Sequence, residues 1–408
     1  MANGNFAGGD GSANNPYLIE DVFDLDAIRN GLDKCYKLID DIDLDIKPFN
    51  EGEGWNPIGG YENPFNGNIN GNNKIIKNLY INRPPNTFQG LFGRTSNSTI
   101  LNLNIVNVDI CASNLSGTIV GESTCYTNIL NCSVSKINAR FSKLSAGGIC
   151  GGVGYSCNIK NCYLKKGTIQ FSQEKQVSTL IGSIGFDCNI INCFAICDLI
   201  TSKPIGGLIG LADGRGGVIK NCFCNGTNTV GILTSNINGN KSIVNCFWNK
   251  DLSNQNSDKG KGITEKELKI KQTFIDADWD KEKLEDGTSV WKLQDGEYPR
   301  LWFEKIEKYL IQDKTNILYT LNENNLLQSP SQILDENNFI NNGFTDIDLV
   351  TRDLLLSKFQ SLEGIKLLVY TDNLEKKECE MIYNCERFRP IDKLKKNSAT
   401  CNILFKKV

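Results

Sequence analysis

The chain contains no histidine among its 408 residues, and this absence restricts the chemistry available to it. Without imidazole there is no Ser-His-Asp or Cys-His nucleophile system, no histidine general base and no histidine-containing zinc site. An enzyme built from this chain would have to use carboxylates, lysine, tyrosine or thiolates.

Long apolar runs and a secretory leader are missing too. No stretch approaches the roughly 18 apolar residues of a membrane span, and residues 1–6 have neither a basic nor an apolar segment. We therefore expect no membrane insertion and a reducing cytoplasm, where the sixteen cysteines would be buried thiols. The net charge of −3 does not favour a nucleic-acid partner.

Repeats organise the first 250 residues. A motif of the form Ile-x-Asn-Cys or Ile-x-Asn-Leu recurs, and its asparagines are spaced by 24, 29, 30, 31, 29 and 24 residues. They are Asn78, Asn102, Asn131, Asn161, Asn192, Asn221 and Asn245. A second motif precedes them, as in Gly90-Leu91-Phe92-Gly93 and Gly207-Leu208-Ile209-Gly210. Short β-branched runs repeated about every 30 residues predict a parallel β-solenoid, because helices need longer runs.

Each repeated residue type then has a structural task. Ile and Leu face the core, whereas Lys160 and Lys220 point to solvent. Stacked asparagines predict an amide ladder. Glycines mark bends where another residue would clash or need a positive φ; they are Gly93, Gly121, Gly151, Gly182 and Gly210. Cysteines after the asparagines form a column of buried thiols that is unfavourable for disulfides; they are Cys132, Cys162, Cys193, Cys222 and Cys246.

Metal or redox chemistry is the alternative for the cysteines. Cys222 with Cys224, and Cys157 with Cys162, are the nearest candidates. Neither matches the Cys-x₂-Cys pairs of a zinc site, so the prediction is that no metal or other cofactor is bound.

The repeats resemble those of bacterial and phage proteins that carry the GLUG repeat. The resemblance covers residues 6–303, including Gly54-Trp55-Asn56-Pro57-Ile58-Gly59 and Asn245-Cys246-Phe247-Trp248-Asn249. It implies a right-handed parallel β-helix, of the kind found on surface adhesins or phage-like tail parts, and supplies no catalytic residues. The repeat near residues 230–240 lacks a Gly-Leu-x-Gly motif, which predicts a truncated last coil.

Four regions follow from these patterns. We expect an N-terminal cap (1–50) with a helix over 21–32 whose N-cap is Asp21, then the β-helix (51–250) and an exit cap (251–303) with a helix over 264–272. Residues 304–408 are expected to form a small α+β docking domain with a hairpin over 308–321, helices within 335–370 and a strand at 367–370. This last region resembles modules of phage tail and tail-like particle proteins of Gram-positive bacteria.

β-Helix tailspikes often cleave glycans with paired acids, so carboxylates that could pair within the coils are the candidates for catalysis. Asp187, Asp198 and Asp213, together with Arg215, are the ionisable residues expected to cluster inside the coils. The alternative is a solvated turn, since turns favour Asp and Gly, and we predict no catalytic residue.

Two further groups of side chains suggest ligands. Trp55, Tyr61, Phe65 and Tyr80 could stack on sugar rings or cover the end of the solenoid; Trp55 and Tyr61, with Arg215, are the binding candidates. The carboxylates within residues 40–45 could bind Ca²⁺, or could discourage edge pairing.

Together these patterns predict a non-enzymatic component of a phage tail or phage-tail-like particle, a tail fibre or baseplate-associated receptor-binding protein. Its expected partners are a bacterial surface glycan or cell-wall polymer and other tail or baseplate proteins, and it would be assembled in the host cytoplasm and released by lysis. A glycan depolymerase and a bacterial surface adhesin are the alternatives. Many tail fibres are homotrimers, but no heptad run here demonstrates one.

Overall fold

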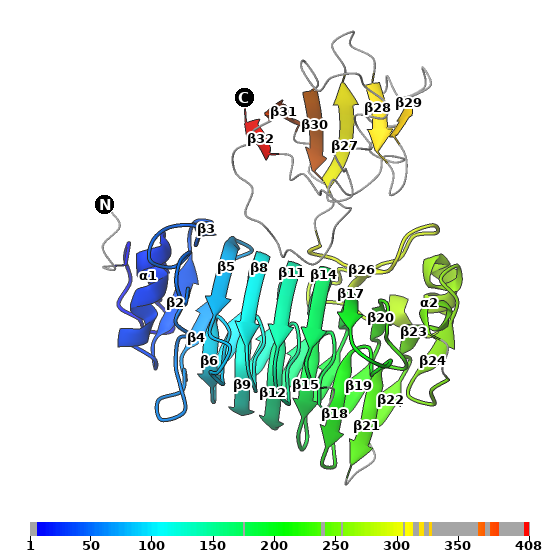
Figure 1. Ribbon diagram of the computed structural model, residues 1–408, viewed down its shortest axis with the longest axis horizontal. Coiled ribbons are helices and arrows are strands. Elements are labelled where there is room, and N and C mark those ends of the chain that lie inside the picture. Colours follow the sequence, from blue (N-terminus) through cyan, green and yellow to red (C-terminus); the bar gives the residue numbers. More distant parts are fainter. Residues whose placement is uncertain are drawn as a thin grey trace. The chain divides into compact units, whose positions relative to one another are not determined.

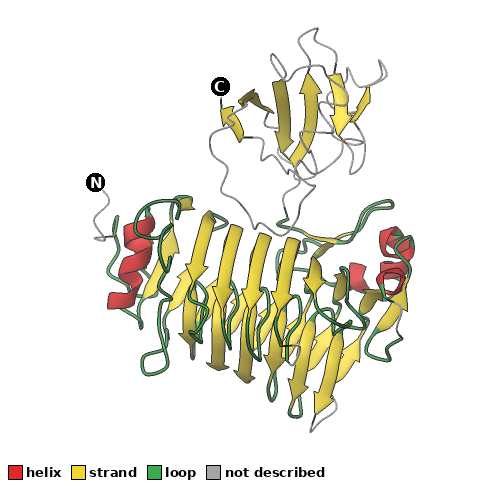
Figure 2. Ribbon diagram, viewed as in Figure 1, coloured by secondary structure: helices red, strands yellow, loops and turns green. Residues whose placement is uncertain are grey.

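The computed structural model describes residues 6–173, 176–237, 241–253 and 256–304, and strands within the segment beyond. The chain divides into two compact units, Met1–Trp302 and Phe303–Val408. The first unit is a parallel β-solenoid with short helices at its ends (Figures 1 and 2). No described helix has the length and apolar character needed to cross a membrane.

Three parallel sheets form the faces of the solenoid. Sheet A contains β1 (Tyr17–Ile19), β2 (Cys35–Leu38), β4 (Asn68–Asn70), β7 (Thr99–Leu101), β10 (Asn128–Leu130), β13 (Asn158–Lys160), β16 (Asn189–Ile191), β19 (Val218–Lys220) and β22 (Ser242–Val244). Sheet B contains β3 (Ile42–Asp43), β5 (Ile75–Asn82), β8 (Asn104–Ala112), β11 (Ser133–Phe141), β14 (Tyr163–Phe171), β17 (Phe194–Ile200), β20 (Phe223–Asn225), β23 (Phe247–Asn249) and β24 (Lys261–Ile263). Sheet C contains β6 (Phe92–Thr95), β9 (Val120–Cys125), β12 (Cys150–Tyr155), β15 (Ile181–Ile184), β18 (Ile209–Asp213) and β21 (Leu233–Ile237).

One coil runs through a strand of sheet C, then sheet A, then sheet B, as β9, β10 and β11 do. The strands pair in register with the same strands of the next coil, for example Ile129 with Ile159. Alternate apolar residues face inward and form one continuous core. The predicted solenoid is therefore confirmed, and it rests on the period-2 pattern within each strand.

The asparagine ladder exists, but it begins at Asn70 and not at Asn78, since Asn102 donates to Asn70 Oδ1 at 3.2 Å. The predicted members Asn221 and Asn245 lie outside it and donate to Glu282 and to Ala277 O. Asn131, Asn161 and Asn192 each donate a side-chain hydrogen bond to the preceding asparagine, over 3.0–3.1 Å. Asn78 does not belong to this ladder, because it lies on β5 in sheet B. The residue after it, Leu79, pairs with Val108 of the next strand in that sheet. Its Ile-x-Asn-Leu motif is a coincidental match within a sheet B strand.

The left-handed backbone conformation falls on the asparagines and not on the glycines of the second motif. Asn102 and Asn161, for example, have φ of 53° and 55°. The motif glycines are required for a different reason: a Cβ on Gly151 would lie 2.2 Å from Ser116 N, and one on Gly210 would lie 2.3 Å from Val177 N. The predicted clash is confirmed, whereas the positive φ was assigned to the wrong residue type.

The predicted column of thiols is confirmed. Cys132, Cys162, Cys193, Cys222 and Cys246 are buried and unbridged. Each Sγ contacts the carbonyl oxygen two residues earlier, as Cys162 does with Lys160 at 3.2 Å. In a neighbouring column, burial raises the pKa of the Cys150 thiol to about 12. These cysteines pack as small apolar residues with weak donors.

The N-terminal cap contains α1 (Val22–Ala27) and η1 (Ile28–Asn30), with Asp21 as the N-cap. Asp21 Oδ1 accepts hydrogen bonds from the amides of Phe23 and Asp24, at 2.8 and 3.0 Å. Leu25 and Ile28 are fully buried on the first coil. The predicted helix is confirmed, although its last turn is a 3₁₀ turn that ends at Gly31.

The other end is closed by a segment that we call the exit strap, residues 264–302. The predicted helix over 264–272 is instead two short elements, because Ile270 is extended between them. The strap elements are η3 (Glu267–Lys269), α2 (Lys271–Ile275), η4 (Trp279–Lys281), β25 (Trp291–Lys292) and β26 (Arg300–Leu301), and η2 (Lys250–Leu252) precedes them.

The second unit contains an antiparallel sheet in the order β29-β28-β27-β30-β31-β32. Its strands are β27 (Glu307–Gln312), β28 (Leu318–Leu321), β29 (Leu326–Gln328), β30 (Lys366–Thr371), β31 (Lys376–Ile382) and β32 (Leu404–Lys407). The predicted hairpin and the strand at 367–370 are confirmed. The helices predicted within 335–370 lie outside the described residues.

Candidate binding surface

Three exposed aromatic rings lie on successive coils where sheet C turns into sheet A. Tyr126, Tyr155 and Phe186 are 56%, 46% and 51% exposed, and we call them the aromatic stripe. The Tyr126 amide donates to Tyr155 O at 2.9 Å, and their ring centroids are 5.8 Å apart. The Ser156 amide donates to Phe186 O at 3.0 Å, which places Phe186 on the next coil. The solenoid repeat thus aligns the rings.

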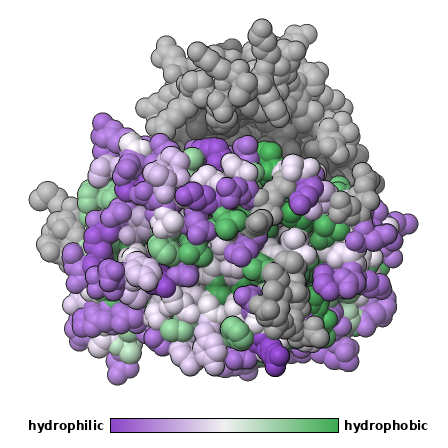
Figure 3. All heavy atoms as spheres, turned by 60° about the horizontal axis from the view of Figure 1, so that its bottom comes forward, coloured by the Kyte–Doolittle hydropathy of each residue, from purple (hydrophilic) through white to green (hydrophobic). Residues whose placement is uncertain are grey.

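The stripe continues toward the loop at 214–217. A Cβ on Gly214 would lie 2.6 Å from the Phe186 ring, so this ring rests against the backbone of the next coil. Strands of sheet C end along the lower edge of the solenoid in Figure 1, and Figure 3 turns that edge forward. There, hydrophobic and hydrophilic side chains are interspersed and do not form one large apolar patch.

Backbone strain accompanies one of these rings. Tyr126 has φ of 46°, a conformation that bulky side chains adopt rarely. Asn97 occupies the matching turn position one coil earlier with φ of 49°, and asparagine tolerates this conformation well. An exposed tyrosine that replaces a favourable asparagine is a strained residue of the kind that gathers at functional sites.

A second amide ladder runs beside the stripe, and the sequence motif did not reveal it. Asn158 donates to Asn128 Oδ1 and Asn189 donates to Asn158 Oδ1, both at 2.9 Å. The Val218 amide donates to Asn189 Oδ1 at 3.1 Å. Because each side-chain amide has two N–H donors and a carbonyl with two lone pairs, these half-buried amides keep hydrogen-bonding capacity toward a ligand.

The structure separates Asp198 from the other two predicted carboxylates. Asp198 lies on β17 in sheet B and accepts hydrogen bonds from Thr227 N and Oγ1, both at 2.9 Å. Asp187 lies at the end of the stripe, and its amide donates to Arg215 O at 2.9 Å. Asp213 ends β18 at the same corner.

Lys241 also lies at this corner, a position that the sequence analysis did not predict. Its Nζ donates to Gly216 O at 2.7 Å, and the residue is almost fully buried. Burial lowers the pKa of Lys241, while the neighbouring Cys188 and Asp187 act in the opposite direction. The corner therefore combines carboxylates, a cation and the exposed Arg215 side chain beside the aromatic stripe.

The predicted binding aromatics differ in exposure. Trp55 and Phe65 are fully buried, and Trp55 Nε1 donates to Leu91 O at 3.0 Å. They fill the first coils, so Trp55 as a sugar-binding residue is wrong. Tyr61 is 64% exposed, with the Arg94 guanidinium 4.6 Å from its ring centroid. It is accessible to a ligand, but it lies outside the aromatic stripe.

The acidic run at 40–45 is occupied by the protein's own donors. Asp41 accepts from the Ile75 amide at 2.8 Å, and Asp43 accepts from Asn78 Nδ2 at 2.6 Å. These bonds favour the alternative in which the carboxylates discourage pairing of the sheet edge with another chain. Within the described part of the chain, the acidic side chains whose ligand atoms cluster are Glu20, Asp21 and Asp24, and Asp21 is the helix cap described above.

Comparison with known proteins finds partial likenesses. No family model matches the chain, so the GLUG resemblance remains a prediction. A "Putative Gly-rich membrane protein" of Evansella cellulosilytica is 48% identical over 90 residues, which are 22% of this chain and 10% of that protein. "Halomucin" of Haloquadratum walsbyi is 38% identical over 122 residues, 28% of this chain and 1% of that protein.

Among solved structures, the crystal structure of a "putative immunoglobulin A1 protease" from Bacteroides ovatus covers 73% of this chain and 96% of its own. It is 17% identical, with a TM-score of 0.43. This likeness is too low to indicate a shared activity.

Proposed function

We propose that the chain is a non-enzymatic binding protein whose aromatic stripe contacts a bacterial surface glycan. The observation that carries the proposal is the alignment of three half-exposed rings on a rigid backbone beside a row of amides. Aromatic faces bind the apolar faces of sugar rings, and amides bind their hydroxyls. Coils about 4.8 Å apart repeat these contacts along an extended polymer.

Each contact on such a surface is weak, and the repetition of these contacts raises the overall affinity for the polymer. Several chains on one particle or cell would convert weak binding into avidity without any new contact. The rigid solenoid also reduces the ordering cost of binding, because its rings are already aligned.

The finer part of the proposal concerns where this binding takes place. We place the chain in a phage tail or phage-tail-like particle, as a tail fibre or baseplate-associated protein, with residues 304–408 docking on other tail or baseplate proteins. The resemblance of that segment to tail modules supports this setting. A cell-surface adhesin is the alternative, supported by the names of the membrane protein and the halomucin that the chain resembles.

A glycan depolymerase is a second candidate, because Asp187 and Asp213 lie with Arg215 at the end of the same stripe. Glycosidases use two carboxylates. If purified chain releases reducing ends from cell-wall glycan, and Asp213→Asn abolishes the release, the protein is an enzyme.

The direct test of the binding proposal uses the full chain labelled with a fluorophore. It is incubated with intact cells and isolated cell walls from a panel of Gram-positive species, with and without soluble wall polysaccharide as a competitor. We expect saturable binding to at least one wall, displaced by its polysaccharide. Absence of binding across the panel would remove support for the proposal.

A further inference from the structure

The thiol column inside the solenoid is a row of metal-ligating side chains that the proposed function does not use. Its members come from the turn between sheet A and sheet B on five successive coils, and all are buried and unbridged. They are Cys132, Cys162, Cys193, Cys222 and Cys246.

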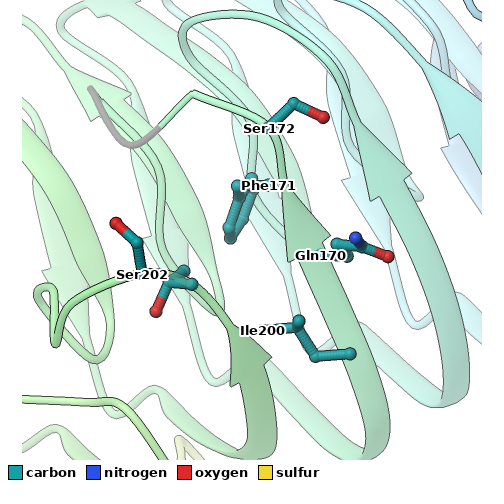
Figure 4. A pocket seen from close by; sticks show the side chains of 6 residues that line it. Gln170, Phe171, Ser172, Ile200 and Ser202 are labelled. Carbon is teal, nitrogen blue, oxygen red and sulfur yellow. The ribbon is translucent and has the colours of Figure 1, made fainter.

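A pocket at the ends of β14 and β17 offers no comparable set of ligands. Its lining contains neither a thiol nor a carboxylate (Figure 4). The lining residues are Gln170, Phe171, Ser172, Ile200, Thr201 and Ser202. The thiol column is therefore the stronger candidate for a site that binds an ion.

Strand pairing stacks each cysteine of the column on the next. Before Cys162, Ile159 pairs with Ile190, and after it Tyr163 pairs with Phe194, so Cys162 lies directly beside Cys193 of the next coil. The same pairing brackets the other members of the column. Neighbouring members are thus separated by the coil repeat of about 4.8 Å.

The sulfur atoms occupy the same position in every coil. Cys162 Sγ lies 3.2 Å from Lys160 O in its own coil and 3.4 Å from Ile129 O in the preceding coil. Across the column these two distances are 3.2–3.3 Å and 3.4–3.7 Å. Because every side chain points the same way, neighbouring sulfurs are also about one coil repeat, roughly 4.8 Å, apart.

This spacing suits a soft metal ion held in line between two sulfurs. Two metal–sulfur bonds of about 2.3 Å span about 4.6 Å, close to the coil repeat of about 4.8 Å. Such an ion takes the place of a thiol proton and needs no separate cavity. Thiolates select Cu(I) among the biological metals, whereas zinc needs four ligands in a tetrahedron, which a straight row does not supply.

We propose that neighbouring thiols of this column bind Cu(I), each ion in line between two sulfurs. The ion forms a bond to both sulfurs, and one of the two thiols releases its proton to solvent. The buried group stays neutral, because one cation replaces one proton. Since each ion takes two of the five thiols, the column holds at most two ions.

Loading of the column has to accompany folding, because the thiols are closed off from solvent in the folded chain. This site goes beyond the proposed function, since it lies inside the solenoid and does not contact a glycan. The sequence did not indicate it, because the expected signal of a metal site is a Cys-x₂-Cys pair and not a cysteine at every repeat.

The test counts copper in the full chain by native mass spectrometry. The chain is produced in copper-supplemented cells, purified without oxygen and treated with an excess of the Cu(I) chelator bathocuproine disulfonate, which removes ions from exposed thiols. Cys157 and Cys188 form a separate stack of two, since Asn158 pairs with Asn189, so every sample carries Cys157→Ser. We expect one or two ions to survive the chelator.

Two variants locate these ions. Cys162→Ser/Cys222→Ser leaves no two neighbouring thiols in the column and should lose the chelator-resistant copper. Cys197→Ser is the matched control, because Cys197 is also buried and its Sγ lies 3.3 Å from a carbonyl oxygen, that of Gly167. It lies outside the column, so its replacement should leave the count of ions unchanged.

X-ray absorption at the copper edge of the sample with the intact column gives the ligands independently of any column variant. We expect two sulfur ligands at about 2.3 Å. If Cys162→Ser/Cys222→Ser does not fold, this spectrum decides the matter. The proposal is overturned if no copper survives the chelator, if the folded double variant retains as much copper as Cys197→Ser, or if the ligands are nitrogen or oxygen.

Discussion

Outside its core the solenoid carries a covered column and an open column of aromatic rings. On the outer face of sheet B, Phe194 lies between Tyr163 and Phe223 with ring centroids 4.9 Å apart on each side. The exit strap covers this column with Trp291, whose ring centroid lies 6.1 Å from that of Phe194 and 6.3 Å from that of Phe223. At the turn from sheet C to sheet A, the aromatic stripe has no such cover among the described residues, and its rings are about half exposed. The same repeat geometry builds both columns, and the covering chain determines which one is left open to solvent.

The strap is fixed at three successive coils. Trp279 Nε1 donates to Asn245 O at 3.0 Å, Lys220 forms an ion pair with Glu282 at 2.6 Å, and Trp291 Nε1 donates to Asn192 Oδ1 at 3.3 Å. These contacts also end the asparagine ladder, because Asn221 donates to Glu282 at 3.2 Å and not to Asn192. The covered column is therefore part of the core of the exit end.

Removing the strap's central ring should have the largest effect. Trp291 is buried, 4.4 Å from Trp279 by ring centroids. Trp291→Ala should lower the free energy of unfolding by about 3–5 kcal/mol, as for other buried aromatic truncations. Chemical denaturation measures this loss. Tyr155→Ala in the open stripe is the matched control and should change stability by less than about 0.5 kcal/mol; equal losses would contradict the distinction between the columns.

Tyr126→Asn should stabilise the protein while it weakens glycan binding. Asparagine accepts the left-handed conformation that Tyr126 adopts, so we expect about 1 kcal/mol of added stability. Thermal unfolding and wall binding are measured on the same sample. A rise in stability with unchanged binding would show that this ring has no part in recognition.

Removing the ion pair between Lys220 and the strap residue Glu282 should have a smaller effect on the free energy of unfolding. Lys220 and Glu282 are about one-third exposed, so Glu282→Gln should cost at most about 1 kcal/mol. Screening predicts that the difference from the unchanged protein shrinks as salt rises. A difference independent of salt would indicate that Glu282 acts through hydrogen bonding to Asn221 alone.

The smallest expected effect is a pH dependence at the start of the strap. Hydrogen bonds from Thr264 N and Oγ1 lower the pKa of Glu267 below its usual 4.5. The folded state thus favours the carboxylate, so this contribution is complete above the unfolded pKa and is lost as pH falls through the folded value. Unfolding curves should show that Glu267→Gln reduces the acid sensitivity slightly; an unchanged pH profile would exclude this contribution.

Much of the architecture could be predicted, because each coil of a solenoid has the same packing requirements and the sequence therefore repeats the same pattern of residues. The core positions, the thiol column and the N-cap at Asp21 all follow from local patterns. Asn78 was misplaced because one motif match can fall in either of two sheets, and only strand pairing distinguishes them. Trp55 was misread because burial depends on how the first coils close over it.

The candidate binding sites were less predictable. Tyr126, Tyr155 and Phe186 occupy two adjacent turn positions, so no fixed spacing links them until the coils are stacked. A register-exact alignment of the coils could have found them.

The most direct test of the central claim is wall binding by the triple variant Tyr126→Asn, Tyr155→Ala, Phe186→Ala, with Tyr61→Ala as the exposed aromatic control outside the stripe. At about 1 kcal/mol per ring, we predict roughly 100-fold weaker binding by the triple variant at undiminished thermal stability, and a much smaller change for Tyr61→Ala. Unchanged binding by the folded triple variant would contradict the claim that the open column is the binding surface.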